Sequence, residues 1–341
     1  MNQFIQLPGE ERRLYFVQTA ERMRISPQIV EKDFWVCWIL SELFALPDIG
    51  GTLIFKGGTS LSKAYRMIER FSEDIDVSID RASLGFGDAF DPREDVSNAE
   101  RKRRMARLME SCRRKIADEL RPAMVQVIES RLEGTRNWSL EIDAADADRQ
   151  TLLYMYPSSL ATVSSAYIKP AVKIEIGARS DHWPSCQVRI MSYVAQQFPK
   201  AFRTPEFVAK VLAAERTFWE KATLLHAEYH RPANKEIPPR LSRHYYDLSR
   251  LILSGLGNKA MDNLKLLRQV VEHKKVFFRS GWAHYDEAKQ GSLRLVPLLQ
   301  RVGALEEDYD HMQEMFFAVR PAFAEVLRIL GEWEHRFNQA A

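Results

Sequence analysis

The sequence has few of the residues that cross-link a chain or anchor it in a membrane. Its 341 residues include only three cysteines, which lie far apart and show no CxxC or Cys/His ligand spacing. A disulfide framework and a structural zinc site are therefore not expected, and a reducing compartment fits. The longest apolar run extends only from Phe34 to Leu40, whereas a membrane-spanning helix needs about 20 residues. No signal peptide is recognisable, so we expect a cytoplasmic protein without membrane contact.

The chain also has no internal repeat and little net charge. Hydrophobic residues make up 45% and charged residues 28%, and the net charge of +3 does not by itself indicate nucleic acid. Positive charge is nevertheless concentrated in two stretches. Residues 101–115 contain eight basic residues and one acidic residue, and residues 265–279 contain five and one. The second stretch precedes Trp282, His284 and Tyr285. Basic residues next to aromatic ones suit RNA, so we expect nucleic-acid contact.

Periodicity predicts a mixed α/β part followed by a helical part. Helices are expected over residues 10–46, with a start signal at Ser26-Pro27, and over residues 98–120. Strands are expected over residues 52–56, 74–79, 122–130, 138–143, 151–157 and 171–178. From about residue 206 the pattern becomes helical and stays so. We therefore expect an α+β fold with two domains, residues 1–200 and residues 201–341.

The stretch FKGGTSLSKAYRMIERFSEDIDVSID contains the residues that indicate chemistry. Gly57 and Gly58 end a strand and let the backbone approach a ligand closely. A helix that begins there, capped by Thr59 or Ser60 and continuing to about residue 69, would offer unpaired N–H groups to phosphate. On the next strand Asp74 and Asp76 point to the same face, where they would repel each other without a cation between them. Magnesium on a triphosphate is the natural occupant.

This stretch resembles the AbiEii/AbiGii nucleotidyltransferase toxins, a family that includes the MenT group and belongs to the DNA polymerase β-like superfamily. Gly58-Thr59 and Asp74-Ile75-Asp76 stand where that superfamily has its glycine-hydroxyl turn and its first two acids. The resemblance extends back to EKDFWV at residues 31–36. A third acid on a later strand is implied. Glu175 in AVKIEIGA is the best candidate, although Glu141 and Asp143 offer the same pattern.

Two later segments resemble the family's C-terminal motifs. The helix AERTFWEKATLLHAEYH would place Lys221 at the nucleotide, and RLSRHYYDLSRL would place Asp247 beside it. On the residues alone, Lys221 is a lysine of an amphipathic helix, and such a lysine usually reaches solvent. Asp247 could equally form a surface ion pair with Arg243 or Arg250 at helical spacing.

The resemblance implies a minimal nucleotidyltransferase fold, with a mixed sheet, flanking helices and an all-helical C-terminal domain that completes the active-site cleft. Asp74, Asp76 and Glu175 would bind two Mg²⁺ ions. Residues 57–60 and Lys221 would bind an NTP, and Asp247 would orient Lys221.

The implied function is that of a bacterial toxin, in a toxin–antitoxin or phage-defence system, which transfers NMP to RNA such as the tRNA 3′ end. Its antitoxin would be encoded elsewhere. Transfer to a protein or small molecule, or a non-catalytic nucleotide- or RNA-binding module, are the alternatives.

Overall fold

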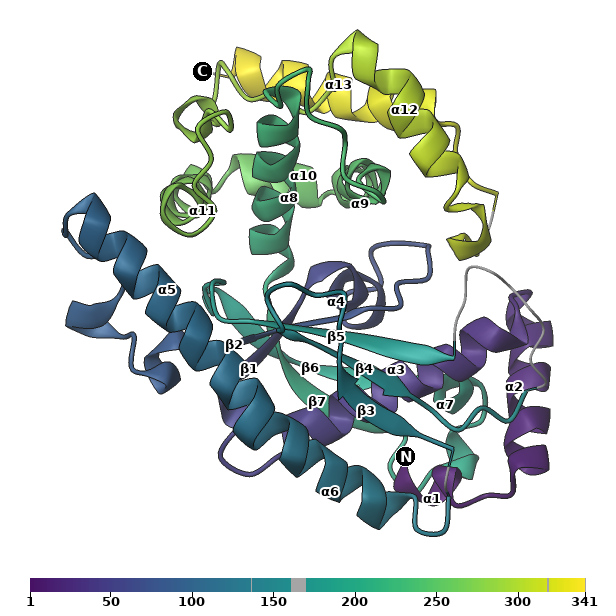
Figure 1. Ribbon diagram of the computed structural model, residues 1–341. Coiled ribbons are helices and arrows are strands. Elements are labelled where there is room, and N and C mark those ends of the chain that lie inside the picture. The colour runs from purple at the N-terminus through teal and green to yellow at the C-terminus, as the bar shows by residue number, and fades with distance from the viewer. Residues whose placement is uncertain (136, 161–169, 318, 341) are drawn as a thin grey trace. The chain divides into compact units, whose positions relative to one another are not determined.

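The protein folds into two compact units in the computed structural model, which describes residues 1–135, 137–160, 170–317 and 319–340 (Figure 1). Unit 1 comprises Met1–Ala64 and Phe71–Leu212. Unit 2 comprises Tyr65–Arg70 and Ala213–Ala341. The chain therefore leaves unit 1 between the diglycine turn and the Asp-x-Asp segment, contributes a short segment to unit 2, and returns.

Unit 1 is built on a mixed sheet, as the sequence predicts. Within the described residues seven strands pair in the order β3-β4-β5-β2-β1-β7-β6. They are β1 Leu53–Lys56, β2 Ile75–Ile79, β3 Ser139–Ile142, β4 Thr151–Met155, β5 Ala171–Gly177, β6 Ser185–Met191 and β7 Glu206–Leu212. The pairs β2–β5 and β1–β7 are parallel and the others are antiparallel. The central strands β1, β2 and β5 are thus neighbours, which brings the sequence-predicted acids of β2 and β5 to adjacent strands.

One face of this sheet packs on a buried helix. The helices at the N-terminus are α1 Asn2–Ile5, α2 Gly9–Met23 and α3 Pro27–Ala45, and those between strands are α4 Gly57–Lys63 and α7 Tyr193–Gln197. Ser26 caps α3 by accepting a hydrogen bond from the Ile29 N–H at 3.4 Å, as the Ser-Pro signal predicts. The rings of Trp35 and Trp38 lie with their centroids 6.0 Å from that of Tyr154 on β4. Because α3 is apolar on most sides, it forms the centre of the core.

A long helical segment forms where the sequence predicted both a helix and a strand. It consists of α5 Asn98–Arg114, a π-helical turn Lys115–Leu120 and α6 Arg121–Arg131. The predicted strand over residues 122–130 is therefore wrong. The buried residues recur every four positions: Leu108, Cys112, Ile116, Leu120, Met124 and Ile128. A spacing of four drifts about 40° per step around a helix of 3.6 residues per turn. The wider π-helical turn offsets part of this drift.

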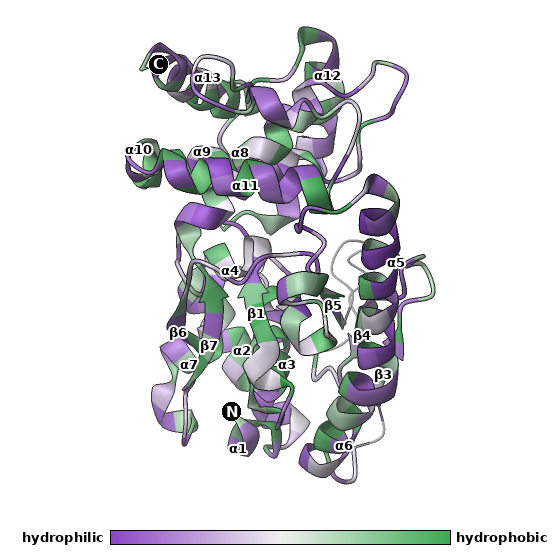
Figure 2. Ribbon diagram, turned by 90° about the vertical axis from the view of Figure 1, so that its left-hand side faces the viewer, coloured by the Kyte–Doolittle hydropathy of each residue, from purple (hydrophilic) through white to green (hydrophobic). Residues whose placement is uncertain are grey.

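α5 is mostly hydrophilic, in contrast with strand β1 (Figure 2). The last two strands of the sheet, β6 and β7, were not predicted from the sequence. Residues 206–212, expected to begin the helical part, form β7, which pairs with both β1 and β6. The helical C-terminal part that the sequence predicted begins only at Ala214.

Unit 2 is helical throughout its described elements. Its helices are α8 Ala214–Tyr229, α9 Ser242–Leu253, α10 Leu256–Met261, α11 Leu264–Phe277, α12 Leu299–Asp310 and α13 Phe323–Gln339. Trp219 of α8 packs against Trp333 and Phe337 of α13, with ring centroids 6.1 and 5.6 Å apart. Trp183 of unit 1, in contrast, is 60% exposed. No described helix of either unit is both long enough and apolar enough to span a bilayer.

Candidate functional site

The diglycine turn gives the carboxylate of Asp76 the space that it occupies. β1 ends at Lys56 and α4 begins at the next residue, Gly57, whose φ is +77°. A Cβ atom on Gly57 would lie 2.0 Å from Asp76 Oδ2 and 2.6 Å from Asp76 Cγ. Only glycine fits both the backbone conformation and this space. The sequence predicts that Gly57 allows a ligand to approach; the structure shows that it allows Asp76 to approach.

The hydroxyl groups of Thr59 and Ser60 stabilise the turn rather than cap the helix. The N-cap of α4 is Lys56, without a side-chain cap, and α4 ends at Lys63, so the predicted cap and the predicted extension to residue 69 are wrong. The buried Thr59 hydroxyl donates to the carbonyl oxygen of Asp74 and lies 2.9 Å from Ser72 Oγ. The Ser60 hydroxyl donates to the Gly57 carbonyl at 2.9 Å. Thr59 therefore ties the glycine turn to the start of the Asp-x-Asp strand.

Two carboxylates share one face of the sheet, and a third directly precedes strand β2. In the parallel pair β2–β5, Asp76 is in register with Glu175, so their side chains point to the same side. Asp74 lies two residues before Asp76, directly before β2, and its charge acts on Lys173, the partner of Glu175. Of the two alternative third acids, Asp143 directly follows β3, and its charge helps to raise the pKa of Lys173. Glu141 is on β3, three strand spacings from β2, or about 14 Å. It binds Arg121 at 2.8 Å instead.

Two lysines accompany these carboxylates. Lys173 donates to Glu175 Oε1 at 2.6 Å. Burial disfavours its charged form, but the hydrogen bond and charge of Glu175 and the charge of Asp74 outweigh burial and raise the pKa of Lys173. Lys56, which the sequence reasoning missed, is in register with Asp76 on β1. The feature of the sequence that could have identified Lys56 is its position at the end of a strand, directly before Gly57.

The donor chemistry of this face fits a hard cation, although its acids do not form a ready-made cage. Carboxylate oxygens are the ligands that Mg²⁺ prefers. Among the described residues, however, no three His, Cys, Asp or Glu side chains are gathered closely enough to hold a metal ion. Glu175 interacts with Lys173, so a cation bound there would compete with the ammonium group for this carboxylate.

A second group of charged residues surrounds Asp247 in unit 2. Arg70 donates to both carboxylate oxygens of Asp247, at 2.7 and 2.8 Å. Lys221 Nζ lies 2.9 Å from Asp247 Oδ2 and 3.1 Å from His244 Nδ1. Asp247 is fully buried and Arg70 is 1% exposed. Arg250, which the sequence suggested as a surface partner of Asp247, pairs with Glu69 instead, at 2.8 Å. Sequence reasoning therefore found Lys221 and Asp247 but missed Arg70.

Burial and charge together hold this group in a defined protonation state. Burial would raise the pKa of Asp247, but the charges of Arg70 and Lys221 outweigh burial and hold that pKa below its usual value. Burial lowers the pKa of Lys221, and Asp247 opposes this shift only partly. Burial and the Lys221 charge lower the pKa of His244 well below 6.5. A neutral His244 can accept a hydrogen bond from the Lys221 ammonium.

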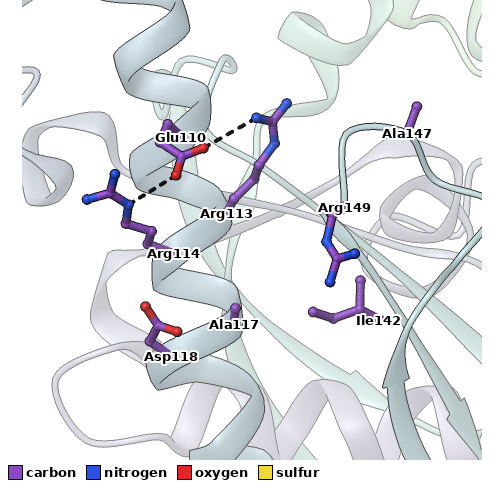
Figure 3. Close-up of a pocket in the computed structure, with 8 residues that line it drawn as sticks. All are labelled: Glu110, Arg113, Arg114, Ala117, Asp118, Ile142, Ala147 and Arg149. Carbon is purple, nitrogen blue, oxygen red and sulfur yellow. Dashed lines mark hydrogen bonds and ion pairs between the residues drawn. The ribbon is translucent and has the colours of Figure 1, made fainter.

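Much of the positive charge of the first basic stretch is paired within α5. Arg103 pairs with Glu100 at 2.9 Å, and Arg114 pairs with Glu110 at 3.1 Å. An open pocket lies beside α5, where Glu110 stands between Arg113 and Arg114 while Arg149 reaches in from the opposite side (Figure 3). It is lined by Glu110, Arg113, Arg114, Ala117, Asp118, Ile142, Ala147 and Arg149. This surface is a mixture of charges rather than a uniformly basic one.

The second basic stretch is partly interior. Lys274 of α11 is 8% exposed and donates to the Glu220 carbonyl at 2.8 Å, and burial lowers its pKa to about 8. Lys275 pairs with Glu272 and Asp286. The ring of Trp282 packs under the Arg231 guanidinium at 4.8 Å. Lys274 is thus engaged inside unit 2 and Lys275 pairs at its surface, whereas Lys265, Arg268 and Arg279 are exposed.

The mixed sheet, the glycine turn and the acids on neighbouring strands define a nucleotidyltransferase. The chain belongs to the AbiEii family of nucleotidyltransferase toxins, because the family described as "Nucleotidyl transferase AbiEii toxin, Type IV TA system" matches residues 38–337. This confirms the resemblance seen in the sequence. Membership implies an NTP substrate and a cognate antitoxin.

A solved structure shares the fold. MenT4, a nucleotidyltransferase toxin from Mycobacterium tuberculosis H37Rv, aligns with 96% of this chain and 94% of its own, with a TM-score of 0.50 and 17% identity. At this identity the likeness shows the fold alone. None of the curated proteins compared matches the chain.

Proposed function

We propose that this toxin transfers NMP from an NTP to a hydroxyl group of an RNA acceptor, with release of pyrophosphate, and that the reaction depends on Mg²⁺. The observation that carries this proposal is the register of Asp76 with Glu175, next to a glycine turn that admits only Gly57. Acids on adjacent strands beside a backbone turn are the parts that phosphoryl transfer uses: ligands for a cation and donors for phosphate.

Each residue of this face has a proposed role. Asp74, Asp76 and Glu175 would hold two magnesium ions, which when bound neutralise the triphosphate and activate the acceptor hydroxyl. The backbone N–H groups of residues 57–60 would bind the β- and γ-phosphates, since the Thr59 and Ser60 hydroxyls are engaged internally. Lys173 would leave Glu175 when a cation binds and become available to the nucleotide.

Lys221 and Asp247 are assigned to the same reaction by the family resemblance. In this proposal the Lys221 ammonium offsets charge on the triphosphate, and Asp247 orients it. What supports the assignment is the way in which Asp247 and His244 hold the ammonium from two sides, at 2.9 and 3.1 Å. A lysine that only reached for solvent would not be 6% exposed.

RNA, with the tRNA 3′ end as the specific candidate, is the proposed acceptor. Lys102, Arg107 and Arg149 are exposed in unit 1 and would contact phosphates. The protein would act in the bacterial cytoplasm, in a toxin–antitoxin or phage-defence system. A protein or small-molecule acceptor is the second candidate, because the pairing of Arg103 with Glu100 and of Arg114 with Glu110 reduces the basic surface.

The test uses NTPs labelled at the α-phosphate, incubated with Mg²⁺ and total RNA. We expect the wild type to label RNA and the Asp76→Asn variant to label nothing. Asp80→Asn is the matched control, since Asp80 lies at the other end of β2 and caps a short helix through the Ala82 N–H. Label on protein would refute the RNA acceptor but leave the chemistry. Equal labelling by the Asp76→Asn variant would refute the assigned site.

A further inference from the structure

We propose that Glu31, Lys32 and Asp33 at the start of α3 are positioning residues that fix the segments carrying the acids and the glycine turn. The proposal rests on the proposed function, since it assigns these residues to the same site. All three side chains are charged, yet their exposed fractions are only 2%, 4% and 1%. Successive helix residues point about 100° apart. One turn of α3 can therefore reach three different segments.

Lys32 holds the residue directly before the first acid. Its ammonium donates to Glu73 Oε2 at 2.5 Å, and both side chains are buried. Glu73 directly precedes Asp74, whose carbonyl oxygen accepts the Thr59 hydrogen bond. The segment that enters β2 is thus fixed from two sides, by Lys32 through a side chain and by Thr59 through the backbone.

Asp33 holds the helix that follows the glycine turn. Its Oδ1 accepts from Lys63, the last residue of α4, at 2.5 Å. Its Oδ2 accepts from the Tyr193 backbone N–H at the start of α7, at 2.7 Å. The Lys63 ammonium also lies 3.7 Å from the centre of the Tyr193 ring. α4 is therefore anchored at the end opposite to Gly57.

Glu31 fixes a third segment, which follows β4. Its carboxylate accepts hydrogen bonds from the Ser158 hydroxyl at 2.6 Å and from the Ser159 N–H and hydroxyl at 2.6 and 2.8 Å. β4 pairs with β5, the strand of Glu175. Each of the three residues thus contacts a segment that leads directly to, or supports, one part of the acid face.

The buried ion pairs of Lys32 and Asp33 are better suited to fixing the positions of segments than to stabilising the fold. Burying an ion pair costs desolvation, and apolar residues of similar volume often stabilise a protein equally well. An ion pair at 2.5 Å, in contrast, fixes the distance and direction between two segments. Acids that must meet a cation and a nucleotide need such accuracy, because misplacement by about 1 Å costs on the order of 100-fold in rate.

The test replaces the Lys32–Glu73 pair by methionines (Lys32→Met with Glu73→Met) in the full chain. The control is Arg81→Met with Asp91→Met, a buried pair 3.0 Å apart that follows the other end of β2 and also pairs with Asp181 and Arg93. Three quantities are measured: the melting temperature, the hydrogen–deuterium exchange of backbone amides without nucleotide or metal, and kcat and KM for the NTP.

We expect both double variants to fold, with the melting temperature of the control lowered at least as far, because its substitutions also remove a partner of Asp181 and of Arg93. Only the Lys32/Glu73 variant should exchange faster over residues 71–76 and lose about 10-fold or more in kcat with little change in KM. If neither exchange nor kcat differs from the control, the proposal is overturned. If that variant does not fold, Glu73→Asp, which keeps the charge but withdraws it by one methylene, must show the faster exchange.

The exchange experiment also separates this proposal from the proposed function. It requires no turnover, so a wild type that transfers no nucleotide would refute the function while the positioning claim is still tested. Slow exchange over residues 71–76 in the folded Lys32/Glu73 or Glu73→Asp variant would refute the positioning claim alone.

Discussion

The substitution Gly57→Ala should separate activity from stability most clearly. Its added Cβ would lie 2.0 Å from Asp76 Oδ2, 2.6 Å from Asp76 Cγ and 2.9 Å from Asp76 Cβ. Distances below 3.0 Å are not found for real Cβ atoms. Because Asp76 Cβ itself is among these atoms, rotation of the side chain alone cannot relieve the contact, and the backbone that carries Asp76 or Gly57 must shift.

Gly57→Ala should have two effects, a loss of stability and a loss of kcat. An alanine at φ +77° costs about 1–2 kcal/mol of backbone strain. That strain lowers the melting temperature by about 2–8 °C in a unit of this size. Displacement of the Asp76 carboxylate by about 1 Å should lower kcat by on the order of 100-fold.

Gly85→Ala is the control that isolates the second effect. Gly85 has φ +84°, and a Cβ there would meet no atom within 4 Å. Both variants should lose stability in thermal unfolding, and Gly57→Ala should lose more because its Cβ also displaces Asp76. Only Gly57→Ala should lose nucleotide transfer from an α-labelled NTP. If both retain wild-type kcat, the placement of Asp76 by the glycine turn does not matter for the reaction and the reasoning is wrong.

Three further predictions concern unit 2 and the cation. Asp247→Asn leaves Arg70 and Lys221 buried without their carboxylate, so urea unfolding should show a loss of about 3–5 kcal/mol; an unchanged midpoint would contradict the described ion pairs. Burial lowers the pKa of Lys221 below 10.5, so kcat/KM should fall as pH rises through that lowered pKa. Lys221→Arg should remove this alkaline fall in activity, and an unchanged pH profile would exclude a charged Lys221 from the reaction. EDTA should abolish labelled transfer and added Mg²⁺ should restore it, whereas full activity in EDTA would refute metal dependence.

Local signals in the sequence were sufficient for the parts of the fold that depend on neighbouring residues. The Ser26-Pro27 start, the strand before Gly57 and the alternation of β5 all require only short-range patterns. The family could be recognised because the glycine turn and the Asp-x-Asp segment lie close together in the chain. These predictions are confirmed by the structure and by the family match.

Other parts could not be found because their patterns are ambiguous or because their partners are distant. Residues 122–130 alternate like a strand, yet their apolar residues also fit a spacing of four, and packing decided for a helix. Arg70 and Asp247 are 177 residues apart, so no local periodicity links them. Likewise, EKDFWV indicated a helix but not the segments that Glu31, Lys32 and Asp33 hold. Buried ion pairs of this kind depend on the strand order, which the sequence pattern does not specify.

The most direct test of the account is a crystal structure of the protein with Mg²⁺ and an NTP whose α,β-bridging oxygen is replaced by a methylene group. The account predicts a cation within about 2.0–2.1 Å of the Asp74 and Asp76 carboxylates. It also predicts the β- and γ-phosphates against the N–H groups of residues 57–60, and Lys173 displaced from Glu175. A triphosphate bound elsewhere, or Asp74 and Asp76 without a cation while the nucleotide is present, would contradict it.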